Sequence, residues 1–232
     1  ETIIRADALT KDYGSNMLLK SISLTVTRGQ CTAFMGHNGS GKTTLLRMLA
    51  GLTTPTAGKI EYTGKPTFGY VPEAFPKSNL TALQYITHMG KIEGLSAHEA
   101  KDKGLDLFAD FFMGSMLHTP MKHLSKGSLQ KVGVIQALLC RHDVLMLDEP
   151  LSGQDTESQQ VFIEKARQCK QDGTAIVLSC HEPYLVNRIA DAVFEIKDGK
   201  LLALARGDAR LAEHDTLLFD IDPDTQPVPM LS

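Results

Sequence analysis

The sequence predicts an α/β fold whose core is a mostly parallel β-sheet, and two observations carry this prediction. First, several short apolar runs lack the polar–apolar alternation of half-exposed strands, which indicates strands covered on both faces. Second, helical patterns lie between these runs, and such alternation along a chain is typical of a parallel sheet. The runs are residues 31–35, 69–71, 144–147 and 175–178, of which 69–71 is too short to judge, and the helical patterns are 43–50, 124–139 and 158–170.

Strands of another kind are predicted on either side of this core. Residues 22–26 alternate between apolar and polar side chains, which is the pattern of a half-exposed strand. Residues 193–196 and 201–203 flank an Asp-Gly pair, a strong signal for a hairpin turn. We therefore expect a flanking antiparallel β-subdomain.

The middle of the chain predicts helices instead of strands. Helical patterns occur at 80–90 and 98–112, with no strand signal between 76 and 124. We expect a helical insert, a subdomain of about 76–135, within one domain that spans 1–207. Residues 208–232 are expected to form a C-terminal tail, whose Leu217-Leu218-Phe219 run packs back on the sheet or meets a partner.

Composition and charge limit the classes of function. The 232 residues carry a formal net charge of −3, so the chain offers no broad basic field, and we expect no nucleic-acid partner. No apolar run approaches the roughly 20 residues that span a bilayer, and the first residues lack a signal-peptide core. The four cysteines form no C-x-x-C pair, which fits buried reduced thiols. We expect a cytoplasmic protein, so another chain would supply any membrane span.

A phosphate-binding loop follows the first of the buried strands. Residues Gly36-His37-Asn38-Gly39-Ser40-Gly41-Lys42-Thr43 match the P-loop pattern between a predicted strand and a predicted helix. Glycines let the backbone N–H groups turn toward phosphates, and the positive end of the next helix faces them. Lys42 is expected to reach the β- and γ-phosphates of a nucleotide, Thr43 to ligate Mg²⁺, and His37 to be a spacer.

An acidic pair ends another buried strand at the same edge of the predicted sheet. Asp148 and Glu149 follow four apolar residues, and open α/β sheets bind their ligands at the carboxyl ends of strands. Asp148 would contact Mg²⁺, and Glu149 would accept a proton from an attacking water. Two acids after a strand would otherwise simply begin a turn, but together with the phosphate loop they indicate phosphoryl transfer.

Together with these motifs, five further segments make the sequence resemble the nucleotide-binding domain of ABC transporters over about residues 3–207. The elements occur in the family's order, and no other P-loop class carries the signature-like segment before the acidic strand. In sequence they are Tyr13, the loop 36–43, Gly69-Tyr70-Val71-Pro72-Glu73, the signature-like Leu124-Ser125-Lys126-Gly127-Ser128, the acidic pair with Leu151-Ser152-Gly153-Gln154-Asp155 after it, and His181.

The resemblance implies roles for the matched residues. Tyr13 would stack on adenine, and His181 would contact the γ-phosphate. Ser125 and Gly127 would contact the ATP of a second domain, which implies a head-to-tail dimer with two ATPs between the protomers. On their own, Tyr13 could equally cover a turn and Ser125 cap a helix. The implied catalytic residues are Glu149, His181 and Glu73; the metal ligands are Thr43, Glu73 and Asp148; and the nucleotide contacts are Tyr13, Gly36, His37, Asn38, Gly39, Ser40, Gly41, Lys42, Thr43, Thr44, Ser125, Gly127 and Asp155.

Two segments depart from the family's pattern. Glu73 stands where glutamine is usual, and its negative charge beside a triphosphate would weaken binding or demand tight metal coordination. Lys126 and Ser128 replace a glycine and a glutamine of the signature, while Ser125 and Gly127 remain. Because Glu149 and the histidine are both present, we expect an active hydrolytic site.

The leading hypothesis is therefore the ATP-hydrolysing subunit of a membrane transporter, which lies at the inner face of the membrane. ATP binding would close a dimer and hydrolysis would reopen it, and this motion would drive a separate permease chain. The lack of a long C-terminal extension favours an exporter type. The alternative is a soluble ABC ATPase, for example one in iron–sulfur assembly, although the scattered cysteines offer no cluster site. A GTPase is disfavoured because the guanine-reading Asn-Lys-x-Asp motif is absent.

Overall fold

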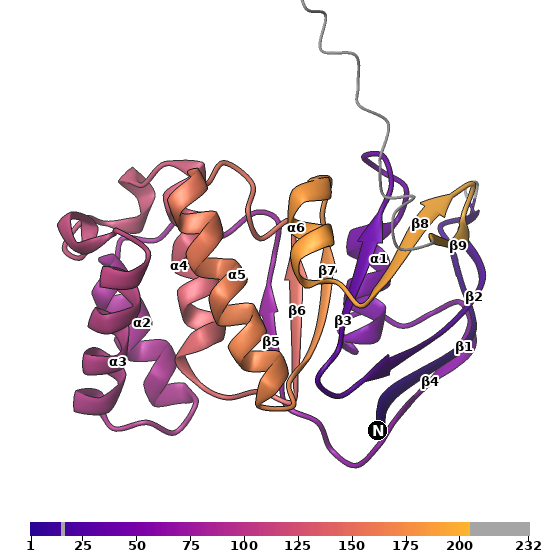
Figure 1. Ribbon diagram of the computed structural model, residues 1–232, viewed down its shortest axis with the longest axis horizontal. Coiled ribbons are helices and arrows are strands. Elements are labelled where there is room, and N and C mark those ends of the chain that lie inside the picture. Colours follow the sequence, from indigo (N-terminus) through magenta and orange to yellow (C-terminus); the bar gives the residue numbers. More distant parts are fainter. Residues whose placement is uncertain (15–16, 205–232) are drawn as a thin grey trace, which may run out of the picture.

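A six-stranded sheet with helices on both faces forms the centre of the molecule in this computed structural model, which describes residues 1–14 and 17–204 (Figure 1). The strand order is β5-β6-β7-β3-β8-β9, with parallel pairing from β5 to β8 and an antiparallel β9 at the edge. The predicted mostly parallel core is thus confirmed, as is the C-terminal hairpin. The strands are β3 (Cys31–Met35), β5 (Phe68–Val71), β6 (Val144–Asp148), β7 (Ala175–Ser179), β8 (Ala192–Lys197) and β9 (Lys200–Leu204).

Alternate residues of the central strands enter two separate hydrophobic cores. In β6, Leu145 and Leu147 pack into one core with helices α4, α5 and α6, whereas Val144 and Met146 pack into the core on the opposite face. Because both faces are covered, the strand reads as a continuous apolar run. The helices on the first face are α4 (Lys126–Leu139), α5 (Thr156–Gln171) and α6 (Pro183–Ile189).

The second core lies between the central sheet and a smaller antiparallel sheet, with helix α1 (Lys42–Leu49) enclosed by both. The smaller sheet has the order β2-β1-β4. In this core Leu45, Leu46 and Met48 of α1 are fully buried. The helix that follows the phosphate loop is therefore fixed in position by the packing of its apolar side chains. The strands are β1 (Thr2–Asp12), β2 (Met17–Thr27) and β4 (Ala57–Tyr62).

Two strands and one helix of the structure were not predicted from the sequence. In β1 the apolar–polar alternation is broken by a bulge at Ala8, whose φ is +49°. Strand β4 is almost wholly exposed apart from Ile60, so it carries no hydrophobic pattern. Helix α6 has 7 residues, too few to show a helical period.

The predicted helical insert forms one end of the molecule, on the left in Figure 1. Helices α2 (Ala82–Ile92) and α3 (Ala97–Asp110) each begin with a capping box, from Thr81 and Ser96 respectively. Their apolar faces bury Ile86 and Phe108 against α4, which joins the insert to the central sheet. The domain boundaries stay a prediction, and the tail expected at 208–232, with its Leu217-Leu218-Phe219 run, lies outside the described residues.

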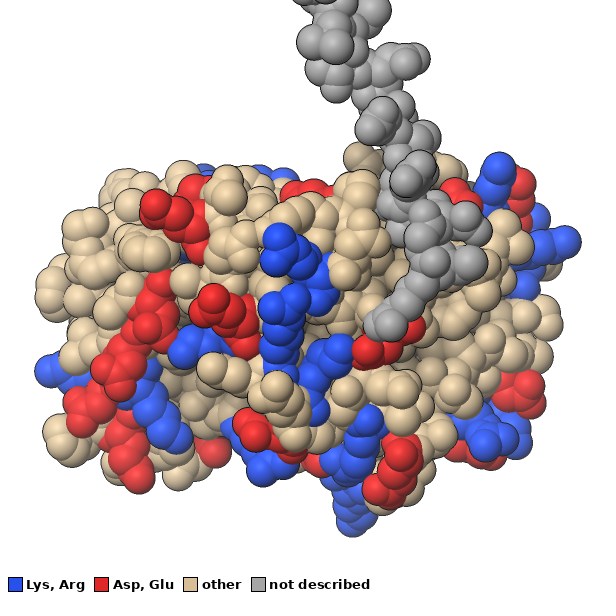
Figure 2. All heavy atoms as spheres, in the orientation of Figure 1, with Lys and Arg blue, Asp and Glu red and all other residues tan. Residues whose placement is uncertain are grey.

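Charge and hydropathy over the described chain agree with the composition. Figure 2 shows acidic and basic side chains interspersed on one face of the molecule, and neither kind covers that face. Of the helices formed by residues 1–14 and 17–204, none is both long and apolar enough to cross a bilayer.

Two phenylalanines of the insert test this packing. Phe108 is fully buried, whereas Phe112, just beyond the same helix, is 58% exposed. We expect Phe108→Ala to lower the free energy of unfolding by about 3–5 kcal/mol through the cavity it leaves. Phe112→Ala is the control and should change it by about 0.5 kcal/mol or less. Equilibrium unfolding in urea measures both, and equal effects would contradict the packing described here.

Candidate functional site

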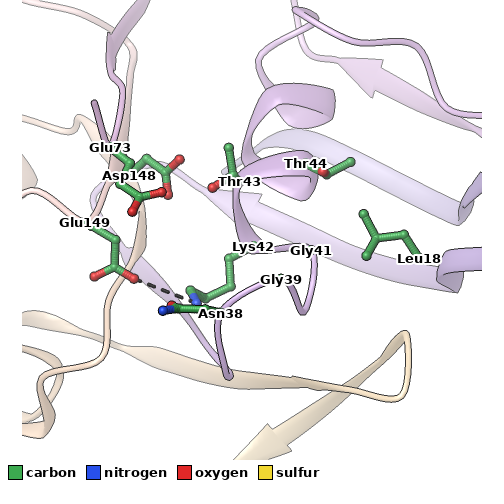
Figure 3. Close-up of a pocket in the computed structure, with 10 residues that line it drawn as sticks. All are labelled: Leu18, Asn38, Gly39, Gly41, Lys42, Thr43, Thr44, Glu73, Asp148 and Glu149. Atoms are coloured by element: carbon green, nitrogen blue, oxygen red, sulfur yellow. Dashed lines mark ion pairs between the residues drawn. The ribbon is translucent and has the colours of Figure 1, made fainter. Parts of the chain in front are cut away.

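A pocket of about 350 Å³ opens where strands β3 and β6 end and helix α1 begins (Figure 3). The sequence-predicted phosphate loop and acidic pair lie on opposite sides of this pocket, so the structure brings together residues more than a hundred positions apart. Its lining residues are Leu18, Asn38, Gly39, Gly41, Lys42, Thr43, Thr44, Glu73, Asp148 and Glu149.

Two glycines shape the phosphate loop for physical reasons. Gly36 has φ of +142°, and a Cβ there would meet the Ser40 Oγ at 2.7 Å and a backbone oxygen of Ile196 at 2.8 Å. Gly41, at φ of +107°, is the N-cap of α1 and provides no side-chain cap. The first N–H groups of this helix therefore remain open to an anion, with the positive end of the helix dipole behind them.

Lys42 is almost buried, at 7% exposure, and its ammonium group folds back over the loop. The Nζ donates to the backbone oxygens of Gly36 at 2.8 Å and His37 at 3.3 Å. It also lies 3.8 Å from the Glu149 Oε1, the ion pair drawn in Figure 3. The charge is thus held at the floor of the pocket, while the ring of His37 is exposed on the outside of the loop.

Asp148 ends β6 with its carboxylate buried at 1% exposure. One oxygen, Oδ1, accepts a hydrogen bond of 2.5 Å from the Ser179 hydroxyl. The other, Oδ2, is buried and has no hydrogen-bond partner among residues 1–14 and 17–204. A buried, unpartnered carboxylate oxygen beside the Thr43 hydroxyl and the Glu73 carboxylate is a set of hard oxygen donors that fits Mg²⁺.

Glu149 follows directly, with a backbone φ of +49° that is unusual outside glycine. Its Oε1 lies 2.9 Å from the His181 Nε2 but accepts no aligned hydrogen bond within the described part of the chain. Burial raises the pKa of this carboxyl to about 7, Lys42 opposes the rise, and the negative charges of Asp148, Glu73 and Glu182 add to it.

His181 completes the cluster from the loop after β7. Burial first, and then the Lys42 ammonium 3.4 Å away, lower the pKa of its imidazole, while Glu73 raises it. A neutral imidazole therefore faces the Glu149 carboxyl, and these two groups together with Lys42 form one contact network. This network places the predicted histidine beside the predicted acid.

Eight of the sequence-predicted site residues do not line this pocket. Gly36, His37 and Ser40 belong to the phosphate loop, and His181 contacts Glu149.

The other four belong to neither group. Ser125 caps α4 by accepting a hydrogen bond from the Ser128 backbone N–H, which agrees with the alternative that this serine is a helix cap. Gly127 packs so closely on the backbone of Gly153 that a Cβ would meet its oxygen at 2.1 Å.

The other two are Asp155 and Tyr13. Asp155 caps α5, and its ion pair with Lys131, at 2.6 Å, lowers the pKa of its carboxyl. Tyr13 is 60% exposed, with the Lys11 ammonium 5.1 Å from the centre of its ring.

Sequence reasoning missed three residues at or behind the pocket. Leu18 lines it from β2, and Ser179 bonds to Asp148 from β7. Gln130, 1% exposed on α4, donates through Nε2 to the backbone oxygens of Pro72, Asp148 and Glu149 at 3.1, 3.4 and 3.4 Å. A glutamine within a helix whose pattern is otherwise largely apolar was the signal that could have revealed it.

The raised pKa of Glu149 predicts a pH-dependent stability. Because its folded pKa of about 7 exceeds the ordinary value of 4.5, the folded state binds more protons between these values, and stability falls as pH rises through about 7. Glu149→Gln removes this loss, so we expect it to gain on the order of 2 kcal/mol over the natural chain above about pH 8, and little below about pH 5.

Urea unfolding at a series of pH values, without nucleotide or divalent metal, measures this difference. The exposed Glu164 on α5 offers a matched control, because Glu164→Gln should leave the pH profile of stability unchanged. Parallel profiles for the natural chain and Glu149→Gln would show that the carboxyl is not perturbed as described.

Comparison with known proteins places this pocket in a family. Residues 19–152, more than half of the chain, match the family model described as ABC transporter. The chain is 33% identical over 199 residues to an uncharacterized ABC transporter ATP-binding protein, MJ1023, of Methanocaldococcus jannaschii, covering 85% of this chain and 75% of that one. It is 31% identical over 218 residues to the zinc import ATP-binding protein ZnuC of Halorhodospira halophila, covering 92% and 81%.

Solved structures agree with the fold. A structure described as the ATP-binding subunit of an ABC transporter has a TM-score of 0.78 and 26% identity, covering 86% of this chain and 88% of that one. The ATP-binding cassette MJ0796, solved as a dimer bound to ADP and Pi, has a TM-score of 0.78 at 21% identity, covering 88% and 99%. The resemblance expected from the motifs is thus confirmed: this chain belongs to the ABC transporter family, as an ATP-binding, ATP-hydrolysing subunit that powers the transport of a solute.

Proposed function

We propose that ATP binds with its phosphates in the pocket of Figure 3 and is hydrolysed there with Mg²⁺. The observation that carries this proposal is the convergence, in one cavity, of an uncapped helix N-terminus, a buried ammonium and an acidic pair in which one oxygen of each carboxylate accepts no hydrogen bond from the described residues. Each of these is costly to bury alone, and together they complement a phosphate chain and its cation.

The residues divide the work of binding. The loop from Gly36 to Thr44, including His37, Asn38, Gly39, Ser40 and Gly41, surrounds the phosphates, and Lys42 neutralises their charge. Thr43, Asp148 and Glu73 hold Mg²⁺, which when bound neutralises and orients the phosphate oxygens. Tyr13, exposed beyond the loop, offers a ring face on which adenine stacks.

Glu149 is the general base in this proposal, and His181 orients it. A base works best when its pKa is close to the working pH, and burial has raised that of Glu149 to about 7. Its Oε1 is turned toward Lys42 and His181, at the side of the pocket where the loop lies. The carboxylate takes the proton of an attacking water, and the neutral imidazole stabilises the charge that develops.

We infer that hydrolysis requires a second cassette arranged head to tail. Ser125 and Gly127 lie at the start of α4 and do not line the pocket, so they are not among the residues that would surround the phosphates of their own chain's ATP. The capped start of α4 is nonetheless a further helix N-terminus able to face an anion. Gly153 and Asp155 lie beside it, so the signature and the loop after the acidic pair would meet the partner's ATP as one unit. The similar cassette MJ0796 was solved as a dimer.

The permease is a separate transmembrane chain in this proposal, and the cassette binds it at the inner face of the cell membrane. The solute is chosen by that chain. The export type expected from the sequence stays a prediction, because the names of similar proteins include both import and export.

The experiment uses Glu149→Gln, which should bind ATP but hydrolyse it poorly. We expect this variant with ATP and Mg²⁺ to elute as a dimer on size-exclusion chromatography with light scattering, and as a monomer without ATP. Adding Ser125→Arg should abolish the dimer while ATP binding persists. A dimer that forms without ATP, or that survives Ser125→Arg, would contradict the head-to-tail arrangement.

The same tagged Glu149→Gln variant tests the transport partner. After gentle solubilisation of native membranes, we expect mass spectrometry to find a stoichiometric polytopic membrane protein with it. Recovery only from the soluble fraction would favour an ABC ATPase that does not act in transport.

Glu73 gives a prediction of its own, because it adds a negative charge where the family usually has glutamine. We expect Glu73→Gln to raise the ATPase turnover a few-fold and to shift the Mg²⁺ dependence, since one carboxylate leaves the metal set. As a control, Glu182→Gln removes a charge that also faces Glu149 but does not line the pocket, so it should leave the Mg²⁺ dependence unchanged. If Glu73→Gln has the turnover and the ATP affinity of the natural chain at every Mg²⁺ concentration, Glu73 neither ligates the metal nor slows hydrolysis.

A further inference from the structure

Ser179 occupies a position behind the acidic pair that no motif accounts for. It is the last residue of β7, is fully buried, and stands opposite Asp148 in the parallel register of β6 and β7. Its hydroxyl donates to the Asp148 Oδ1 at 2.5 Å and accepts from the Glu149 backbone N–H at 3.1 Å. One hydroxyl thus bridges both acidic residues.

We propose that Ser179 is a positioning residue that fixes the orientation of the Asp148 carboxylate toward Mg²⁺ and holds the backbone of Glu149 in place. This inference rests on the proposed function, since it concerns the metal and the base of that site. Ser179 itself does not line the pocket, so it acts through its two neighbours.

The carboxylate of Asp148 is held by this one hydroxyl. The last side-chain torsion of an aspartate is broad, so a hydrogen-bond donor is needed to fix the plane of the carboxylate. The Ser179 hydroxyl engages Oδ1, and Oδ2 stays buried without a partner in the described part of the chain. The bond therefore leaves one oxygen committed and the other available, as a ligand that binds through a single oxygen requires.

The backbone of Glu149 needs a similar restraint. A non-glycine residue at φ of +49° is strained and persists only where its surroundings hold it. The Glu149 N–H is shared between the hydroxyl of Ser179, at 3.1 Å, and its backbone oxygen, at 3.2 Å. Gln130 approaches the carbonyl of Glu149 from the other side, at 3.4 Å. The strand end of β7 thus restrains the N–H side of the strained residue.

A purely structural role is the competing explanation, because any buried hydroxyl must find partners. Thr174 provides the matched case, immediately before the first residue of the same strand. It is 3% exposed, and its Oγ1 donates to the His142 backbone oxygen at 2.9 Å, far from the pocket. Ser179→Ala and Thr174→Val each remove one buried hydroxyl with little change of shape.

The test measures metal binding directly, with Mn²⁺ as the probe and a non-hydrolysable ATP analogue present. Electron paramagnetic resonance gives the Mn²⁺ affinity without any turnover. We expect Ser179→Ala to weaken it about 10-fold, as loss of a residue that orients a metal ligand commonly does. Thr174→Val should bind Mn²⁺ as the natural chain does, although unfolding in urea shows a similar loss of stability. Ser179→Thr, which keeps the hydroxyl, should restore most of the affinity.

The outcomes separate this inference from the proposed function. Failure of the natural chain to bind Mn²⁺ with the analogue would overturn the proposed site itself. Normal binding by the natural chain together with equal affinities for Ser179→Ala and Thr174→Val would overturn only the role of Ser179. If Ser179→Ala does not fold, Ser179→Cys keeps a weak donor, and its Mn²⁺ affinity should be lower than those of the natural chain and of Ser179→Thr. A cysteine variant that binds as tightly as the natural chain would contradict the proposal.

Discussion

The burial of the central strands on both faces is the constraint on which the rest of this structure depends. Strands β3, β6 and β7 run parallel between two cores, so none of them can shift register without exposing apolar side chains to the wrong surroundings. Their carboxyl ends consequently meet at one fixed edge. The phosphate loop, Asp148, Glu149 and Ser179 all follow or end these strands, and their mutual positions are set by the stability of the whole core.

The same packing stabilises charges that would be costly elsewhere. Lys42 and Asp148 are more than nine-tenths buried, and each is satisfied in part by the backbone or by a buried hydroxyl. Glu149 is less well compensated, with a raised pKa, an oxygen without an aligned partner and a strained backbone. An unfavourable backbone conformation and a perturbed pKa on the same residue are typical of residues at functional sites. A fully hydrogen-bonded carboxylate would have little tendency to accept a proton.

Two helix N-termini in the molecule are finished differently, and the difference matches the roles proposed for them. Helix α1 begins at a glycine without a side-chain cap, inside the pocket. Helix α4 is capped by Ser125, which accepts a hydrogen bond from one backbone N–H of the first turn. Gly127, in the same turn, packs against the backbone of Gly153. The first N-terminus is open to a phosphate in the pocket of its own chain, and the second contacts the loop that we propose meets the partner's ATP together with it. Gln130, three residues after Gly127 in the same helix, links that helix to the backbone of the acidic pair.

The sequence by itself determined the family, the class of fold and most of the pocket. Local patterns were sufficient because glycine spacing, buried-strand composition and the acidic pair each depend on near neighbours in the chain. The bulged β1, the exposed β4 and the short α6 escaped prediction, since their positions depend on pairing and packing with distant residues. Only the tertiary structure brought Ser179 beside Asp148, 31 positions away. A serine at the end of a strand carries no local signal, because its partner is chosen by the register of two parallel strands.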